Sequence, residues 1–243
     1  METPKMSVPE ISDRIAAINW EQITRTLHDK GFVIVKAILN KQECDTLIDN
    51  YDNGNYRKTV NMDRYRYGSG EYKYYDYPLP AVINELRENV YPNIAPVANA
   101  WMQELGIDKS FPLTHAEMKQ LSHDNGQLKP TALILKYGPG GFNTMHQDLY
   151  GEVYFPMQMV FVLNQANEDF TGGEFVITEQ IPRAQSKANV LVPDRGDMVI
   201  FTTNFRPAKG AKGYHRVNMK HGVSPLHSGN RHSLGIIFHD ALS

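Results

Sequence analysis

The chain has 243 residues, of which 41% are hydrophobic and 21% charged, and its net charge is −2. This composition is ordinary for a globular protein, no apolar run approaches the length of a membrane span, and the charge balance shows no overall basic excess of the kind that binds a phosphate backbone, although a local basic strip stays open. The single cysteine cannot form an internal disulfide, and the opening residues METPKMSVPE lack the apolar stretch of a secretory signal, so we expect a cytoplasmic protein without membrane contact.

Helix signals dominate the first half of the chain. Capping residues and periodic apolar residues predict helices in four segments, which are residues 19–31, 40–53, 79–106 and 114–126. Pro92 and Pro96 interrupt the third segment, so it contains either two helices or one kinked helix. A β-branched run at residues 31–35 predicts a strand.

After Pro130 the pattern changes to short apolar runs separated by glycine and proline. Such runs predict strands in residues 131–137, 158–163, 174–177, 198–202, 216–221 and 232–239. Many short strands at regular spacing favour a β-sandwich or a jelly roll. We therefore predict an α+β fold and a single domain over residues 1–243. Residues 1–129 would form a mainly helical layer that supports a jelly-roll core in residues 130–243.

His146 and Asp148 stand two positions apart. On a strand, such residues project from the same face, so both side chains can reach one metal ion. Two histidines and one carboxylate form the facial triad of non-haem iron(II) oxygenases. The pair alone also fits a polar pair on a surface strand. Several downstream histidines compete for the third position, namely His215, His221, His227, His232 and His239.

Arg231 decides among these histidines, because it follows His221 by ten positions and is itself followed by Ser233. An enzyme that uses 2-oxoglutarate must hold the distal carboxylate of that molecule, and a guanidinium pairs with a carboxylate through two hydrogen bonds. A buried arginine without an anion would be costly, and the co-substrate supplies the anion. We therefore assign the metal to His146, Asp148 and His221, and the co-substrate to Arg231 and Ser233.

Five pieces of sequence resemble, in order and spacing, the active-site signature of the 2-oxoglutarate/iron(II) dioxygenase superfamily. They are Lys136-Tyr137-Gly138, His146-Gln147-Asp148, Phe170–Glu174, Arg195–Phe201 and His221–Leu234. The pieces are most similar to the prolyl-hydroxylase-type branch, in which a basic residue follows the last histidine by about ten positions. This resemblance implies a double-stranded β-helix and makes Tyr137 a second contact to 2-oxoglutarate.

A narrower resemblance involves residues 147–152 and 235–241, which are similar to a little-studied bacterial oxygenase group labelled as oxidative demethylases of damaged nucleic acid. AlkB-type demethylases carry two arginines after the last histidine, and here only Arg231 is placed. The superfamily implies iron(II), 2-oxoglutarate and dioxygen, with ascorbate as a candidate reductant. Its products are succinate, carbon dioxide and a hydroxylated substrate, which loses an alkyl group where the oxidised carbon bears nitrogen.

Two further segments are candidates for substrate recognition. Tyrosines alternate with arginine and lysine in residues 62–77, which predicts either a lid over the site or an edge hairpin. Residues 204–214 form a glycine-rich basic loop, which either rims the site or is simply solvated. Together with a glutamine that follows the first ligand pair, these segments give the substrate candidates Arg64, Tyr65, Arg66, Tyr67, Gln158 and Arg206.

The near-neutral charge and the tyrosine-rich segment favour a small polar or zwitterionic metabolite as substrate, such as an amino-acid derivative or a natural-product intermediate. Oxidative demethylation of alkylated nucleic-acid bases is the main alternative, and it would need a basic groove and stacking aromatic side chains. Protein prolyl hydroxylation is a third possibility. A non-catalytic, cupin-like binding module is disfavoured because all three metal ligands and Arg231 are present. The sequence leaves the oligomeric state open.

Overall fold

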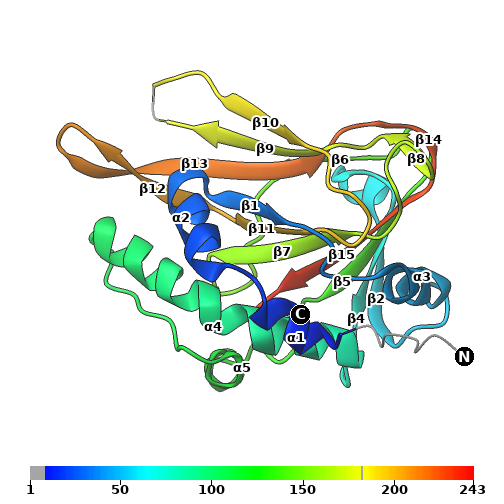
Figure 1. Cartoon of the computed structure of the whole chain (residues 1–243), viewed down its shortest axis with the longest axis horizontal. Coiled ribbons are helices and arrows are strands. Elements are labelled where there is room, and N and C mark those ends of the chain that lie inside the picture. Colours follow the sequence, from blue (N-terminus) through cyan, green and yellow to red (C-terminus); the bar gives the residue numbers. More distant parts are fainter. Residues whose placement is uncertain (1–8, 182) are drawn as a thin grey trace, which may run out of the picture.

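The protein is described here by a computed structural model, in which residues 9–181 and 183–243 are placed (Figure 1). Residues 1–8, where the sequence predicts no secretory signal, lie outside the described residues. Within the described part of the chain, no helix has both the length and the hydropathy that a membrane span requires.

The described residues form five α-helices and one 3-10 turn beside the strands. They are α1 (Ile11–Ala16), α2 (Trp20–Lys30), α3 (Lys41–Asp49), η1 (Met62–Tyr65), α4 (Ala81–Glu104) and α5 (His115–Asp124). The predicted caps are present: the side chains of Asn19, Asn40 and Thr114 each accept a hydrogen bond from a backbone N–H in the first turn of the following helix. These bonds satisfy donors that a helix start would otherwise leave unpaired.

The strands form two main sheets, and all strand pairs in them are antiparallel. The seven-stranded sheet has the order β1 (Phe32–Val35), β11 (Met198–Thr202), β7 (Met157–Val162), β15 (Arg231–Ile237), β5 (Leu133–Tyr137), β4 (Glu71–Tyr75) and β2 (Tyr56–Asn61). The second sheet has the order β10 (Lys187–Leu191), β9 (Phe175–Gln180), β13 (Gly213–Val223), β6 (Phe142–His146) and β3 (Gly68–Ser69), with β12 (Phe205–Gly210) paired to β13. A short pair joins β8 (Phe170–Gly172) to β14 (Leu226–Gly229).

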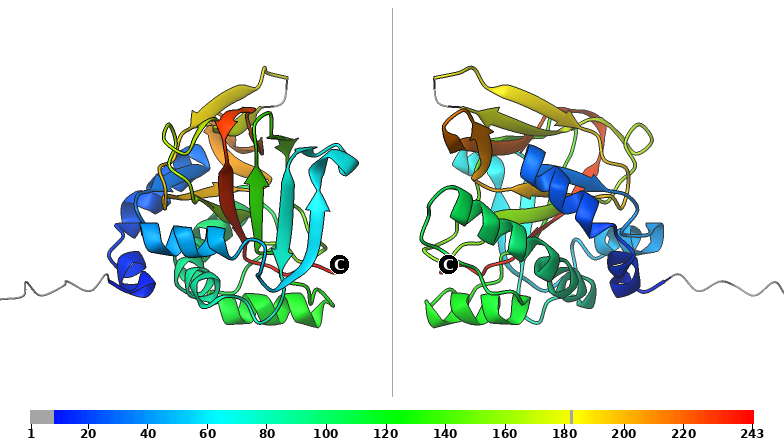
Figure 2. Two further views of the ribbon diagram at one scale, coloured as in Figure 1. Left: turned by 90° about the vertical axis from the view of Figure 1, so that its right-hand side faces the viewer. Right: turned by 60° about the vertical axis from the view of Figure 1, so that its left-hand side comes forward.

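Each central strand of the seven-stranded sheet divides its side chains between two apolar cores. On β7, Met159 packs in the core that includes α4, whereas Val160 packs in the core between the two sheets. On β15, Leu234 and Ile236 face the helices in the same way. Because successive side chains on a strand alternate, Arg231, Ser233 and Gly235 must face the space between the sheets. Figure 2 shows the helices gathered on one side of this sheet.

The structure confirms the six strands predicted after Pro130, with shifts of a few residues at their ends. Of the two alternatives for the segment with two prolines, the structure shows a single helix, α4. One prediction needs correction, because the first half of the chain also contributes strands β2, β3 and β4. Within residues 62–77, β4 pairs with β2 at the edge of the large sheet, which fits the predicted edge hairpin, and β3 pairs with β6.

Candidate active site

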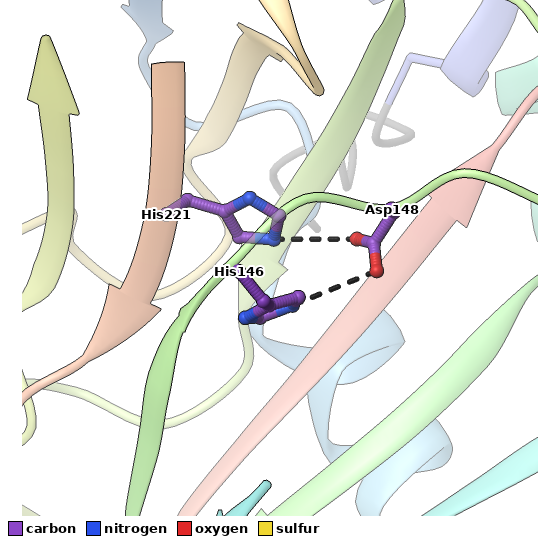
Figure 3. Close-up of side chains that lie close together, drawn as sticks. All are labelled: His146, Asp148 and His221. Atoms are coloured by element: carbon purple, nitrogen blue, oxygen red, sulfur yellow. Dashed lines mark ion pairs between the residues drawn. The ribbon is translucent and has the colours of Figure 1, made fainter. Parts of the chain in front are cut away.

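Three potential metal ligands converge between the two sheets. His146 ends β6 and His221 lies on β13, and the two residues are direct partners in the antiparallel ladder. Their rings therefore lie on the same face of the sheet, with centroids 4.2 Å apart. Asp148 reaches the pair from the following loop, with its carboxylate oxygens 3.5 Å from His146 Nε2 and 3.3 Å from His221 Nε2 (Figure 3). One ligand atom from each residue lies within 4.8 Å of the others.

Asp148 is not on a strand, so the pleat argument made from the sequence does not explain its position. β6 ends at His146, and the next residues have no regular secondary structure. Side chains hold the carboxylate instead: Tyr150 donates a hydrogen bond to Oδ1 at 3.1 Å, and Gln158 donates one to Oδ2 at 2.8 Å. Gln158 lies on β7 and is buried.

The protonation of the site suits metal binding. The Thr144 carbonyl lies 2.7 Å from His146 Nδ1 and can only accept, so Nδ1 carries the proton and Nε2 keeps its lone pair for a metal. Burial lowers the pKa of His221 and keeps its ring neutral. Burial alone would raise the pKa of Asp148, but its contacts with His221, His146 and Gln158 outweigh the burial, so that pKa is lowered and the carboxylate is ionised.

Arg231 is a buried cation beside the same space. Its Nη1 donates a hydrogen bond to Ser233 Oγ at 2.6 Å. Among the described residues it makes no ion pair, and its Nε and the neighbouring Tyr137 hydroxyl have no hydrogen-bond partner. Tyr137 is its direct partner on β5, and the guanidinium carbon lies 5.7 Å from the tyrosine ring centroid. A buried guanidinium without an anion is costly, so this site fits the carboxylate of 2-oxoglutarate.

One cavity joins the two groups. It has a volume of about 420 Å³ and is lined by the three potential metal ligands and by Arg231, Ser233 and Tyr137. Tyr72, Tyr74 and Tyr150 also line it, together with apolar side chains such as those of Val160 and Phe201, and Tyr65 and Tyr67 line it as exposed residues. The arrangement can hold a metal ion, a dicarboxylate and a further small group side by side.

A family model described as "Oxygenase, catalysing oxidative methylation of damaged DNA" matches residues 70–241. This range includes the potential metal ligands, Arg231 and the other cavity residues named above, with the exception of Tyr65 and Tyr67. The chain belongs to this oxygenase family. An uncharacterized protein of Mycobacterium tuberculosis, found in strains H37Rv and CDC 1551, is 42% identical over 164 residues, which cover 68% of this chain and 70% of that protein.

Solved structures of other oxygenases share the fold. A prolyl-4-hydroxylase from Pseudomonas putida gives a TM-score of 0.50 at 14% identity and covers 89% of this chain and 96% of its own. A 2OG-Fe(II) oxygenase-family oxidoreductase from Burkholderia pseudomallei gives 0.50 at 16% identity, with 98% and 95% covered. A Trichoplax adhaerens prolyl hydroxylase, solved with a peptide of hypoxia inducible factor, gives 0.52 at 13% identity, with 97% and 94% covered.

Family membership, this shared fold and the His-Asp-His cluster together confirm the expected class. The protein is an oxygenase and therefore an oxidoreductase, its fold is shared with 2OG-Fe(II) oxygenases and prolyl hydroxylases, and its His-Asp-His cluster fits a metal site of that kind. Its fold is a mixed α and β structure with antiparallel sheets, similar to the jelly-roll folds of that superfamily.

The structure separates the substrate candidates of this oxygenase into two groups. Tyr65, Tyr67 and Gln158 line the cavity. Arg64 and Arg66 are exposed and do not line it. Arg206 does not line the cavity: its guanidinium pairs with Glu179 at 2.8 Å, and the segment that carries it is strand β12, which pairs with β13.

Sequence reasoning did not find the residues that hold the loop after β6. The buried amide of Gln127 bonds to the backbone of Tyr150 and Val153 at 2.8–3.0 Å. Tyr74 donates to the Tyr150 hydroxyl at 3.1 Å and so extends the hydrogen bonds that reach Asp148. The alternating tyrosines at 72 and 74 were the available signal, since they place two rings on one face of a strand.

Proposed function

We propose that His146, Asp148 and His221 hold iron(II) and that Arg231, Ser233 and Tyr137 hold 2-oxoglutarate, within a double-stranded β-helix that forms one domain with the helices. When bound, these groups supply the oxidation of a substrate C–H bond by dioxygen, with release of succinate and carbon dioxide. The observation that carries the proposal is a buried, unpaired Arg231 that lines the same cavity as three mutually adjacent ligand side chains.

The residues of the chain have separate tasks in this proposal. The two neutral imidazoles and the ionised Asp148 give a ligand set with one negative charge, which leaves positions open for the co-substrate and dioxygen. Arg231 and Ser233 orient 2-oxoglutarate through its distal carboxylate, and the Tyr137 hydroxyl donates to the same group. The apolar side chains of Val160 and Phe201, which also line the cavity, exclude water from the reacting atoms.

For the substrate we favour a small polar or zwitterionic molecule that is hydroxylated or loses an N-alkyl group. The supporting observation is the cavity wall, which includes Tyr72, Tyr74 and Tyr150, with the Tyr150 hydroxyl bonded to Asp148 and the Tyr74 hydroxyl bonded to that of Tyr150. Hydroxyl groups both donate and accept hydrogen bonds, so they suit a substrate that carries amine and carboxylate groups.

The second candidate substrate is an alkylated nucleic-acid base. The family description names damaged DNA. In this chain, Tyr65 and Tyr67 stack at a centroid distance of 5.5 Å and are 55% and 48% exposed beside the cavity. Exposed aromatic rings offer a stacking surface for a base that has left its duplex.

Succinate release measured with iron(II) and 2-oxoglutarate tests the enzyme class, and a panel of zwitterionic metabolites and methylated oligonucleotides tests the substrate. We expect turnover to be stimulated by one of the two classes and to be lost in His146→Ala and in Asp148→Ala, which also lose bound metal. His227→Ala, an exposed histidine in the same half of the chain, serves as the control and should retain activity. Activity in both ligand variants would refute the site.

A further inference from the structure

Two neighbouring β-hairpins carry a concentration of positive charge that the cavity does not use. The hairpins are β9–β10 (residues 175–191) and β12–β13 (residues 205–223), and together they contain seven lysines and arginines but one acidic residue, Glu179, although the whole chain has a net charge of −2. One acid cannot neutralise seven cations, so the hairpins keep a positive charge.

Most of these cations are exposed to solvent, although Arg216 also stacks over the Phe205 ring, with its guanidinium carbon 4.3 Å from the ring centroid. Six are exposed, namely Arg183, Lys187, Lys209, Lys212, Arg216 and Lys220. Lys187 lies 3.5 Å from Glu179, which also binds Arg206 at 2.8 Å. Among the described residues, the other five exposed cations make no ion pair. Surfaces of soluble proteins usually intersperse charges of both signs, so a surface of one sign is informative.

The hairpins lie side by side because their strands are consecutive in the second sheet, in the order β10, β9, β13, β12. Figures 1 and 2 show both hairpins projecting from the same end of the molecule. On β13, Arg216 and Lys220 alternate with the buried Val217 and Met219 and are exposed on the opposite face. From Gly213 at the tip to His221 at the site, the strand spans about 27 Å at the usual rise of about 3.4 Å per residue.

An aromatic side chain stands among these cations. Tyr214 is 44% exposed at the tip of the second hairpin, where it is the ladder partner of Lys209. Glu104, at the end of α4, raises the pKa of Tyr214, so one acid does lie beside the tip. A tyrosine between lysines is the combination that single-stranded nucleic acid contacts through its bases and its phosphates.

We propose that this hairpin surface, formed by Arg183, Lys209, Lys212, Tyr214, Arg216 and Lys220, binds the phosphate backbone of a nucleic acid strand. Unpaired cations along a rigid sheet release the counterions that condense on phosphates, and this release drives sequence-independent binding. The surface is separate from the cavity. Its place in the reaction rests on the nucleic-acid candidate of the proposed function, for which it would anchor the strand whose base enters the site.

Fluorescence anisotropy of a labelled single-stranded oligonucleotide of about 20 nucleotides, between about 50 and 200 mM salt, tests the proposal. The full-length protein is compared with the double variant Lys209→Glu/Lys212→Glu. We expect binding to weaken by about ten-fold or more, and the slope of log affinity against log salt to fall by about 0.7 for each lost phosphate contact.

The matched control is Lys41→Glu/Lys129→Glu, which changes the net charge equally at exposed positions outside the hairpins and should weaken binding by less than about two-fold. Equal losses in the two double variants would overturn the proposal, as would oligonucleotide binding too weak to measure at about 50 mM salt. Binding of polyglutamate with no binding of the oligonucleotide would also overturn it and assign the surface to an acidic protein. Succinate release without added substrate should be unchanged in the hairpin variant, so failure of this inference is distinguishable from failure of the oxygenase assignment.

Discussion

Asp148 is held by neighbouring side chains rather than by the backbone of a strand. Tyr150 donates to one carboxylate oxygen and Gln158 to the other, at 3.1 and 2.8 Å. Such partners orient a metal ligand and set its basicity, and they matter nearly as much as the ligand itself. Tyr150 is in turn fixed by Tyr74, so it acts as a positioning residue.

Replacing Tyr150 with phenylalanine removes one hydrogen bond to Asp148 and leaves the ring in place. We expect iron(II) to bind about ten-fold more weakly, because the loss of such a partner typically costs between ten- and a hundred-fold in metal affinity. Anaerobic titration of the metal-free protein measures this. Tyr65→Phe, at the mouth of the same cavity, should bind iron(II) like the parent protein; a Tyr150→Phe variant with parental affinity would show that Gln158 alone suffices.

Residue chemistry predicted more of the site than residue geometry did. The types and spacing of His146, His221 and Arg231 were sufficient to single them out, because few side chains can bind iron or a buried carboxylate. Gln158 was expected to contact the substrate; it lines the cavity and also contacts Asp148 and lies 3.2 Å from His221 Nε2. This role depends on a contact between β7 and the loop after β6, and no local sequence pattern predicts that contact.

Helix ends were predictable at the element scale, whereas some strands were not. A cap such as Thr114 with Glu117 is complete within four residues, so the sequence shows it directly. Strands β2 and β4 gain their hydrogen bonds partly from β5, more than fifty residues away in the chain. Their alternating tyrosines fit a lid as well as a strand until that partner is known.

Helix α4 shows tertiary packing overriding a local signal. Pro92 and Pro96 lie inside it, although each proline costs about 3 kcal/mol in a helix interior. Eleven of its residues are buried, among them Trp101 and Tyr91. Burial of one large apolar side chain contributes about 1.5–3 kcal/mol, so this face outweighs both prolines. The helix therefore continues through both prolines, because burial of its apolar face stabilises it more than the prolines destabilise it.

The side chain of Gln127 satisfies backbone hydrogen-bonding groups of the loop that carries Asp148. The Gln127 amide bonds to the Tyr150 and Val153 carbonyls and accepts a hydrogen bond from the Val153 N–H. Gly151 packs against it with a φ of +91°, and a Cβ there would lie 2.5 Å from Gln127 Oε1.

In Gln127→Leu, the loop groups stay buried but lose their partners. We expect the free energy of unfolding to fall by about 1–3 kcal/mol, the usual cost of an unsatisfied buried polar group, and iron(II) affinity to fall with it. Urea denaturation and metal titration measure the two effects. Gln120→Leu, on the exposed side of α5, should change stability by less than about 0.5 kcal/mol; similar losses in both variants would show that Gln127 merely fills space.

At the scale of the whole molecule, the helices stabilise the sheet on one face and leave the other face free for chemistry. The larger core packs α4 and its neighbours against residues such as Met159, Leu234 and Ile236. The opposite face can then expose Arg231 and Ser233 to a cavity without loss of the main apolar contact. Polar groups are also buried near the C-terminus, where Asp240 pairs with Arg87 at 3.0 Å.

Two buried histidines near this pair make the whole fold sensitive to acid. His115 Nε2 lies 3.2 Å from the Phe238 carbonyl, and His239 Nδ1 accepts a hydrogen bond from the Phe155 N–H at 3.0 Å. Burial lowers the pKa of each to about 3, whereas an unfolded histidine titrates near about 6.5. Between these pH values the two histidines are protonated in the unfolded chain but neutral in the folded chain. The free energy of unfolding therefore falls as the pH falls through that window.

We therefore expect the free energy of unfolding to decrease from pH 7 to pH 5 by about 2 kcal/mol for each of these two histidines. Urea denaturation at a series of pH values measures the slope. His239→Gln keeps a polar group able to accept from the Phe155 N–H but cannot titrate, so its stability should fall less steeply with acid. His227→Gln, at an exposed position, should keep the parental slope. A parental stability that stays constant between pH 7 and pH 5 would contradict the neutral, buried state of these rings.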